Sequence, residues 1–313
     1  MGSDAHVIVV GGPADLTQRA RRRVDELEQR WSRFLPGSEI SRLNRRAGTA
    51  VLVSAETVQL VEHGIEAWRI SGGAVDPTVL GDVIRAGYDR SFERLGGAPT
   101  GCPEARPFSL LGIGCDHIEV FGDRVRLPAG TGFDPGGIGK GLAADLVAAE
   151  TMAAGADGVC VNLGGDLRVV GTSPTGEGWT VAVEHPWADG ALALLGIDDG
   201  AVATSTTLRR RWEADGVTRH HLIDPASGLP SDTDVNLATV VAGRAWMAEV
   251  MAKAVLLRGS EHPFDLIDGT DAEALIIGAG GRVTASAGFA AYLGWASLPA
   301  GIAVPLQPTK SAG

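Results

Sequence analysis

The sequence predicts an α+β fold of mostly antiparallel sheets flanked by helices. Short segments rich in β-branched residues follow one another closely, at residues 159–162, 167–170, 179–184, 201–204 and 237–241. Two further pairs of segments, 118–120 with 125–127 and 274–277 with 282–285, enclose glycine-containing turns typical of hairpins. Because successive hairpins pair antiparallel, this order favours α+β over a regular alternation of parallel strands and helices.

Four helices are expected between these strands, after a first strand over residues 6–10. Apolar residues at steps of three and four predict a long helix with one buried stripe, formed by Leu16, Ala20, Val24, Leu27, Trp31 and Phe34. A second helix should begin after the N-cap Ser54 and end near Gly72. A third is expected over about 140–154 and a fourth over 245–257.

Composition limits the class of protein. The chain has 313 residues, 44% of them hydrophobic and 21% charged, which excludes extended disorder. We expect one domain over residues 1–304, made of two closely packed lobes, and a frayed tail at 305–313. The net charge of -11 argues against nucleic acid or an anionic membrane as a partner. The three widely spaced cysteines and the absence of a signal-like N-terminus predict a cytoplasmic protein.

The segment at residues 134–141 has the composition of an anion site. It reads Asp-Pro-Gly-Gly-Ile-Gly-Lys-Gly and precedes a predicted helix. Glycines let backbone N–H groups and a helix N-terminus approach a phosphate, and Lys140 adds a positive charge. The segment matches neither a Walker A loop nor a Rossmann fingerprint. Taken alone, it could equally be a tight turn.

Two other segments could complete such a site. Thr204, Ser205 and neighbouring hydroxyls come shortly before His220, His221 and Asp224. Together they could bind phosphate and move a proton. A turn at Asp224-Pro225 that follows a strand ending in exposed histidines is the simpler reading of the second segment.

The helix over 245–257 is apolar on nearly every side, and its two charges are Glu249 and Lys253. These residues stand four apart, the spacing of a helix ion pair. Since a solvated face would hold more polar residues, we expect the pair to point into a pocket or into the interior. Structural burial without a function would also fit the pattern.

Taken in order, these motifs resemble the ApbE family of FAD:protein FMN transferases. The resemblance begins at Met1 and extends over nearly the whole chain, through residues 34–44, 73–78, 134–141, 161–166, 203–205, 221–228, the Glu249/Lys253 helix and 285–289. It implies a two-lobed α+β protein that binds FAD between its lobes. It also implies transfer of FMN from FAD to a Thr or Ser hydroxyl of an acceptor flavoprotein, with release of AMP. FAD hydrolysis to FMN and AMP, or an FAD carrier with an altered metal site, are the alternatives.

The resemblance also assigns roles to individual residues. It places Met1, Phe34, Ser38, Glu39, Asn44 and Asp76 in the flavin or adenine site, and Asp134, Gly136, Gly137, Gly139 and Lys140 at the diphosphate, with Thr204 and Ser205 opposite. It assigns His221 to proton removal from the acceptor hydroxyl, with Asp224 as its support.

The metal site departs from the family pattern. Members that bind Mg²⁺ use an Asp and a Thr one helical turn apart, plus a backbone carbonyl of the glycine loop. The matching positions here are Glu249, Lys253 and Gly139. Glu249 can offer an oxygen to Mg²⁺, but a charged lysine has no lone pair to donate. We therefore expect the Lys253 ammonium, held by Glu249, to take part or all of the metal's place, which makes a need for Mg²⁺ doubtful.

Overall fold

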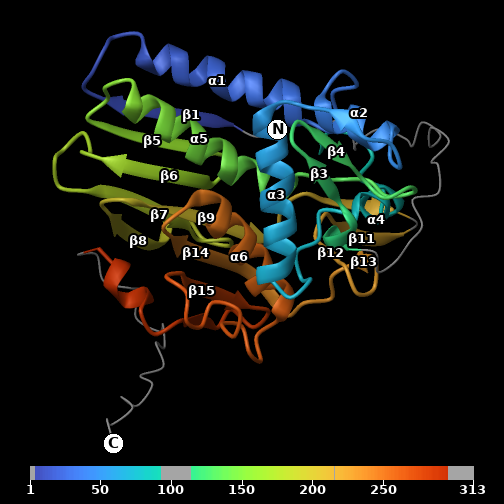
Figure 1. Ribbon diagram of the computed structural model, residues 1–313. Helices are drawn as coiled ribbons and strands as arrows, with labels where there is room; N and C mark the ends of the chain where they lie inside the picture. The colour runs from blue at the N-terminus through green and yellow to red at the C-terminus, as the bar shows by residue number, and fades with distance from the viewer. Residues whose placement is uncertain (1–3, 93–113, 215, 295–313) are drawn as a thin grey trace, which may run out of the picture.

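A seven-stranded antiparallel sheet forms the centre of the chain. The computed structural model describes residues 4–92, 114–214 and 216–294. The strands of the sheet, in spatial order, are β1 (Ala5–Val10), β5 (Gly158–Leu163), β6 (Asp166–Gly171), β9 (Gly200–Thr206), β14 (Val235–Ala242), β15 (Glu273–Gly278) and β16 (Val283–Ala285). Every neighbouring pair is antiparallel, so the predicted α+β class is confirmed (Figure 1).

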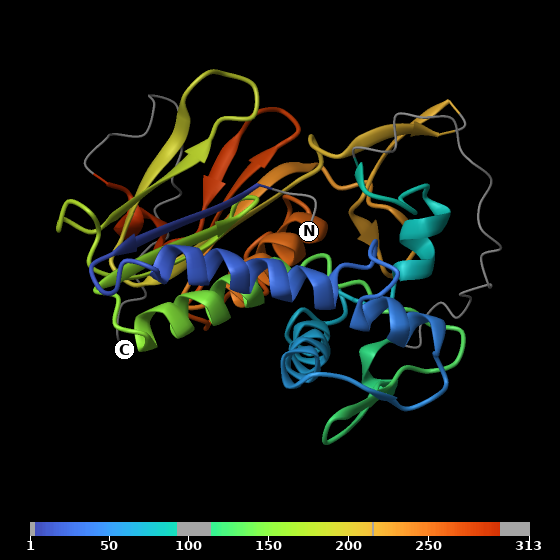
Figure 2. The same ribbon diagram turned by 90° about the horizontal axis from the view of Figure 1, so that it is seen from above.

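Helices cover one face of this sheet and a hairpin covers the other. Helices α1 (Leu16–Trp31), α5 (Gly139–Ala153) and α6 (Ala245–Arg258) pack on the first face. The hairpin of β7 (Trp179–Glu184) and β8 (Ala191–Ile197) packs on the second face, as the view from above shows (Figure 2). The sheet has a hydrophobic core on each face, because side chains along a strand point alternately to its two faces. In β9, Ala201 and Ala203 face the helices, whereas Val202 faces the hairpin.

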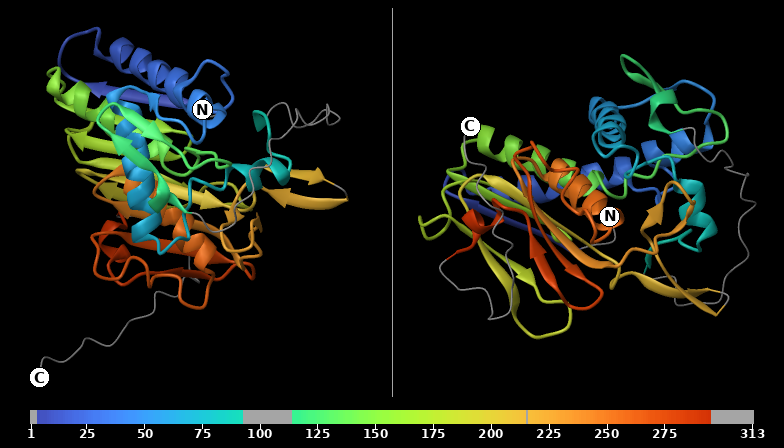
Figure 3. Two further views of the ribbon diagram at one scale, coloured as in Figure 1. Left: turned by 45° about the vertical axis from the view of Figure 1, so that its right-hand side comes forward. Right: turned by 90° about the horizontal axis from the view of Figure 1, so that it is seen from below.

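Smaller elements lie beside the main sheet. Three helices are α2 (Glu39–Arg45), α3 (Ala55–Ile70) and α4 (Leu80–Arg85), and one small sheet contains β2 (Val51–Leu52), β4 (Arg124–Arg126) and β3 (Glu119–Phe121). Two hairpins, β10 (Arg211–Ala214) with β11 (Val217–His220) and β12 (Ile223–Asp224) with β13 (Leu229–Pro230), follow β9. Short 3₁₀ turns occur at Cys115–His117 and Phe289–Tyr292. The β10–β11 hairpin extends beyond the main sheet (Figure 3).

Helix α6 is fixed to α5 by close backbone contact and by a buried carboxylate. Asp145 on α5 accepts hydrogen bonds from the N–H groups of Ala245 and Trp246, both at 3.0 Å, and so satisfies the first turn of α6. Arg168 lies 3.3 Å from the same carboxylate. At Gly141 a Cβ atom would come within 2.2 Å of the Ala245 carbonyl oxygen, so the crossing of the two helices requires glycine there.

All four predicted helices are present, although α1 ends at Trp31 and so does not include Phe34, and Ser54 caps α3 by accepting a hydrogen bond from the Thr57 N–H. The structure adds the helices α2 and α4 and the strands β2, β8, β10, β12 and β13, which the sequence did not predict. In the described part of the chain, no helix combines the length and the apolar character needed to cross a bilayer. The predicted tail at 305–313 lies outside the described residues.

Candidate functional site

Most of the predicted site residues line one pocket of about 980 Å³. Its walls come from the loop before α5, from β9, α6 and the segment around β12, so residues far apart in the sequence meet there. The predicted residues that it brings together are Phe34, Asp76, Asp134, Gly136, Gly137, Gly139, Lys140, Thr204, Ser205, His221, Glu249 and Lys253.

The glycine loop forms one wall of the pocket and leads directly into α5. Asp134 accepts a hydrogen bond from the Gly136 N–H at 2.9 Å, which folds the loop back on itself. Gly137 has a φ of 120°, and a Cβ there would lie 3.2 Å from the Lys253 side chain. The loop thus needs glycine for its backbone conformation and for the close approach of a lysine. The N-terminus of α5 behind it attracts an anion.

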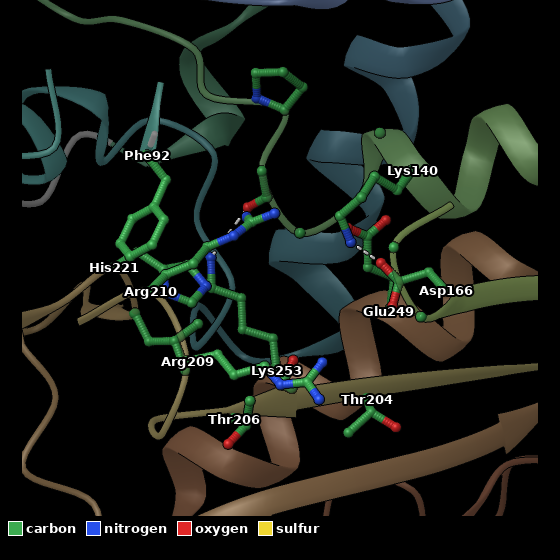
Figure 4. A pocket seen from close by; sticks show the side chains of 18 of the residues that line it. Phe92, Lys140, Asp166, Thr204, Thr206, Arg209, Arg210, His221, Glu249 and Lys253 are labelled. Carbon is green, nitrogen blue, oxygen red and sulfur yellow. Dashed lines mark hydrogen bonds and ion pairs between the residues drawn. The ribbon is translucent and has the colours of Figure 1, made fainter. Parts of the chain in front are cut away.

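Two lysines stand at this loop with different partners. Lys140 forms ion pairs with Asp166 and with Glu249, whose Oε1 lies 3.1 Å from Lys140 Nζ. Figure 4 shows these three residues together on one side of the pocket. Glu249 also accepts a hydrogen bond from the Gly141 N–H at 2.7 Å. Both of these partners of Glu249, Gly141 and Lys140, therefore lie on α5.

Lys253 does not form the expected ion pair with Glu249. Its Nζ instead donates a hydrogen bond to the Gly136 carbonyl oxygen at 3.3 Å, because the side chain extends along the glycine loop. Burial lowers the pKa of Lys253, against the raising influence of Asp134, Glu249 and Asp76. The prediction that both residues of the helix point into a pocket is confirmed, whereas the predicted pairing is wrong.

The donor set does not fit Mg²⁺. One Glu249 oxygen accepts from a backbone N–H and the other faces the Lys140 ammonium. The second ligand position of the family pattern is the ammonium of Lys253, which cannot coordinate a cation while charged. Across the described ranges, no group of three His, Cys, Asp or Glu side chains is placed to hold a metal ion.

His221 lies in the pocket on the opposite side from Lys140. Its Nδ1 is shielded from solvent and has no hydrogen-bond partner within the described part of the chain. Burial holds the pKa of His221 well below its ordinary value, and the positive charges of Arg210, Lys253 and Lys140 lower it further. The imidazole is therefore neutral at pH 7 and able to accept a proton.

The predicted support from Asp224 is not present. Asp224 does not line the pocket, and its carboxylate accepts a hydrogen bond from the Ala226 N–H at 3.0 Å in the turn that follows β12. This arrangement is the Asx turn that an Asp-Pro sequence favours.

Three other predicted residues have internal partners outside the pocket lining. Ser38 caps α2 by accepting from the Ser41 N–H at 3.0 Å, and Glu39 accepts from Ser54 and Thr57 at the start of α3. Asn44 forms two hydrogen bonds with the backbone of Phe133, at 2.9 and 2.7 Å, immediately before the glycine loop. Ser38, Glu39 and Asn44 therefore stabilise segments next to the pocket but do not line it. Met1 lies outside the described residues.

Several side chains that line the pocket were not predicted from the sequence, among them Arg33, Tyr88, Arg209 and Arg210. The Arg33 guanidinium lies 4.2 Å from the ring centre of Phe34 and 4.7 Å from that of Tyr88, and its Nε is 3.4 Å from Asp134. The run of arginines at 209–211 was the signal in the sequence that could have identified two of them.

Comparison with known proteins identifies the family of the chain. The model of the ApbE family matches residues 1–276. The chain belongs to the ApbE family. A FAD:protein FMN transferase of Treponema pallidum is 31% identical over 272 residues, covering 80% of this chain and 74% of that protein. Its counterpart in Vibrio cholerae is 27% identical, covering 82% and 77%. The fold is similar to that of the ApbE protein of Thermotoga maritima, with a TM-score of 0.82, 24% identity, and 94% and 96% of the two chains covered.

Proposed function

We propose that this ApbE-family chain transfers FMN from FAD to an acceptor protein and releases AMP. The observation that carries the proposal is a neutral, buried histidine in the same pocket as a glycine loop with two lysines. This arrangement suits attack on a diphosphate, and the names of the curated relatives support the same reaction. The acceptor group is the hydroxyl of a Thr or Ser.

In the proposed mechanism, His221 takes the proton of the acceptor hydroxyl. The hydroxyl oxygen forms a bond to the phosphorus of the FMN half, and the bond from that phosphorus to the bridging oxygen breaks. AMP leaves with the bridging oxygen, and the FMN phosphate becomes a phosphoester of the acceptor. The aromatic residues Phe34 and Tyr88 offer faces on which a ring of FAD can stack.

The positive charge for this step comes from the protein. The dipole at the N-terminus of α5 attracts the diphosphate, and Lys140 and Lys253 bring positive charge to it. Lys253 takes the place that the family pattern gives to a metal ligand. Since an ammonium carries one charge and Mg²⁺ two, we expect slower transfer than a metal site would give.

The test is a time course of AMP release and of covalent flavin, with FAD and the proteins that accept FMN from the Treponema pallidum and Vibrio cholerae relatives. Wild-type protein should produce both products in equal amounts. His221→Gln should lower the rate about 10²-fold or more while FAD binding changes little. AMP without covalent flavin would make the chain an FAD hydrolase, and bound but unchanged FAD would make it a carrier.

A further inference from the structure

Arg210 has a backbone conformation that is unusual for its type. Its φ is 51°, and among the described residues no other non-glycine residue has a positive φ. This left-handed conformation is costly for a side chain with a Cβ and persists where the surrounding structure imposes it. The residue lies between the pocket strand β9 and the β10–β11 hairpin. An unfavourable conformation at a pocket wall points to a function for the side chain.

The hairpin brings Arg210 next to His221. The last pair in the antiparallel register of β10 and β11 is Arg211 with His220, so Arg210 and His221 are the residues that follow at the open end of the hairpin. Both residues line the pocket, and the close-up view shows them together on one side of it (Figure 4). The charge of Arg210 is also the largest electrostatic influence on the His221 imidazole after burial.

We propose that Arg210 is a further catalytic residue, whose guanidinium binds the non-bridging oxygens of the phosphorus that the acceptor hydroxyl attacks. The inference rests on the proposed function, because it assumes a diphosphate in this pocket. The acceptor hydroxyl gives its proton to His221, its oxygen bonds to that phosphorus, and AMP departs with the bridging oxygen. Arg210 stabilises the negative charge during this exchange, from the side opposite the Lys140 ion pairs.

The decisive variant is Arg210→Gly, which removes the guanidinium and at the same time suits the positive φ. Arg210→Lys keeps a charge but loses the planar fork of donors. Arg211→Ala is the matched control, because Arg211 is exposed and does not line the pocket. Each protein is tested with FAD and the acceptor used for the wild type, by single-turnover AMP release and by flavin-fluorescence titration of FAD binding.

The expected result is a loss of AMP-release rate of about 10²-fold in Arg210→Gly, a partial loss in Arg210→Lys, and no change in Arg211→Ala. The dissociation constant of FAD should change by less than about threefold, since the interaction strengthens in the transition state. A rate for Arg210→Gly equal to that of the wild type would overturn the proposal. Weaker FAD binding with an unchanged rate constant would assign Arg210 to binding. No AMP release by the wild type would instead overturn the proposed function.

A second readout separates a catalytic role from a structural one. The groups that face His221 are Arg210, Lys253, Lys140 and His220, and the Tyr88 ring lies beside it. Removal of one of these positive charges should raise the pKa of His221, measured by NMR titration with His221→Gln to assign the signal. Arg211→Ala should leave that pKa nearly unchanged. An identical titration of His221 in Arg210→Gly and wild type would contradict the placement of the guanidinium beside the imidazole.

Discussion

His221 combines burial with positive neighbours, and both effects favour its neutral form. Because the pKa of the imidazole is lowered, protonation should inactivate the base only at a pH well below the ordinary histidine value of about 6.5. We predict that kcat/KM for AMP release stays level from pH 8 to 6 and falls below that range. A decline centred near pH 6.5 would show an unshifted histidine. His262→Gln, at an exposed position outside the pocket, is the control and should keep the wild-type profile.

The chemistry of single residues was largely readable from the sequence, but their partners were not. The glycine loop and both charges of α6 were singled out from residue type and spacing, whereas the role of His221 came from the family resemblance. The spacing of Glu249 and Lys253 shows that they share a helix face, yet it does not reveal that Lys140 on another helix approaches Glu249. Ser38 and Asn44 were assigned to FAD by resemblance, whereas their polar atoms cap a helix and clamp Phe133.

At the scale of elements, the crossing of α5 and α6 determines the geometry of the cationic side of the pocket. Gly141→Ala would place a methyl group against the Ala245 carbonyl, so the helices must separate. We predict a loss of about 1–3 kcal/mol in the free energy of unfolding, together with reduced activity, because Lys140 and Glu249 lie on the two helices. Gly196→Ala on β8 has open space for its Cβ and should be nearly neutral. Equal denaturation midpoints for the two variants would show that the crossing of α5 and α6 does not require glycine at position 141.

A second element, the segment that ends at the glycine loop, is held by Asn44. Asn44→Ala removes both hydrogen bonds to Phe133 and leaves buried backbone groups without partners. We predict a lower thermal midpoint and weaker FAD binding, measured by calorimetry and flavin fluorescence. Glu62→Ala, at an exposed position of α3, is a control expected to change neither. Unchanged FAD binding by Asn44→Ala would show that the loop does not depend on this clamp.

The large elements were predictable because their patterns are strong, and the small ones were not. Helices α1 and α3 show clear stripes or caps, and the β5–β6 hairpin has a glycine turn. Helices α2 and α4 are only 7 and 6 residues long, too short for a periodic pattern to stand out. Their positions depend on tertiary contacts, such as the bonds from Glu39 to α3.

At the scale of the whole molecule, the fold gathers five positively charged side chains around one pocket in a chain with a net charge of -11: Arg33, Lys140, Arg209, Arg210 and Lys253. Acidic partners at Asp134, Asp166, Glu184 and Glu249 hold three of them in place. Asp4 and Asp76 line the same pocket, which makes six carboxylates against five cations, so an anion site there depends on where the individual cations lie and not on a net positive charge. The proposed transfer without a divalent cation therefore rests on Lys253 at the glycine loop and on Arg210 beside His221.

The most direct test of that claim measures FMN transfer with EDTA or with Mg²⁺, in the wild type and in the double variant Glu249→Asp/Lys253→Thr, which restores the family's metal-ligand pair. The account predicts equal rates in both buffers for the wild type, and Mg²⁺-dependent transfer for the double variant. Transfer by the wild type that EDTA abolishes and Mg²⁺ restores would contradict it.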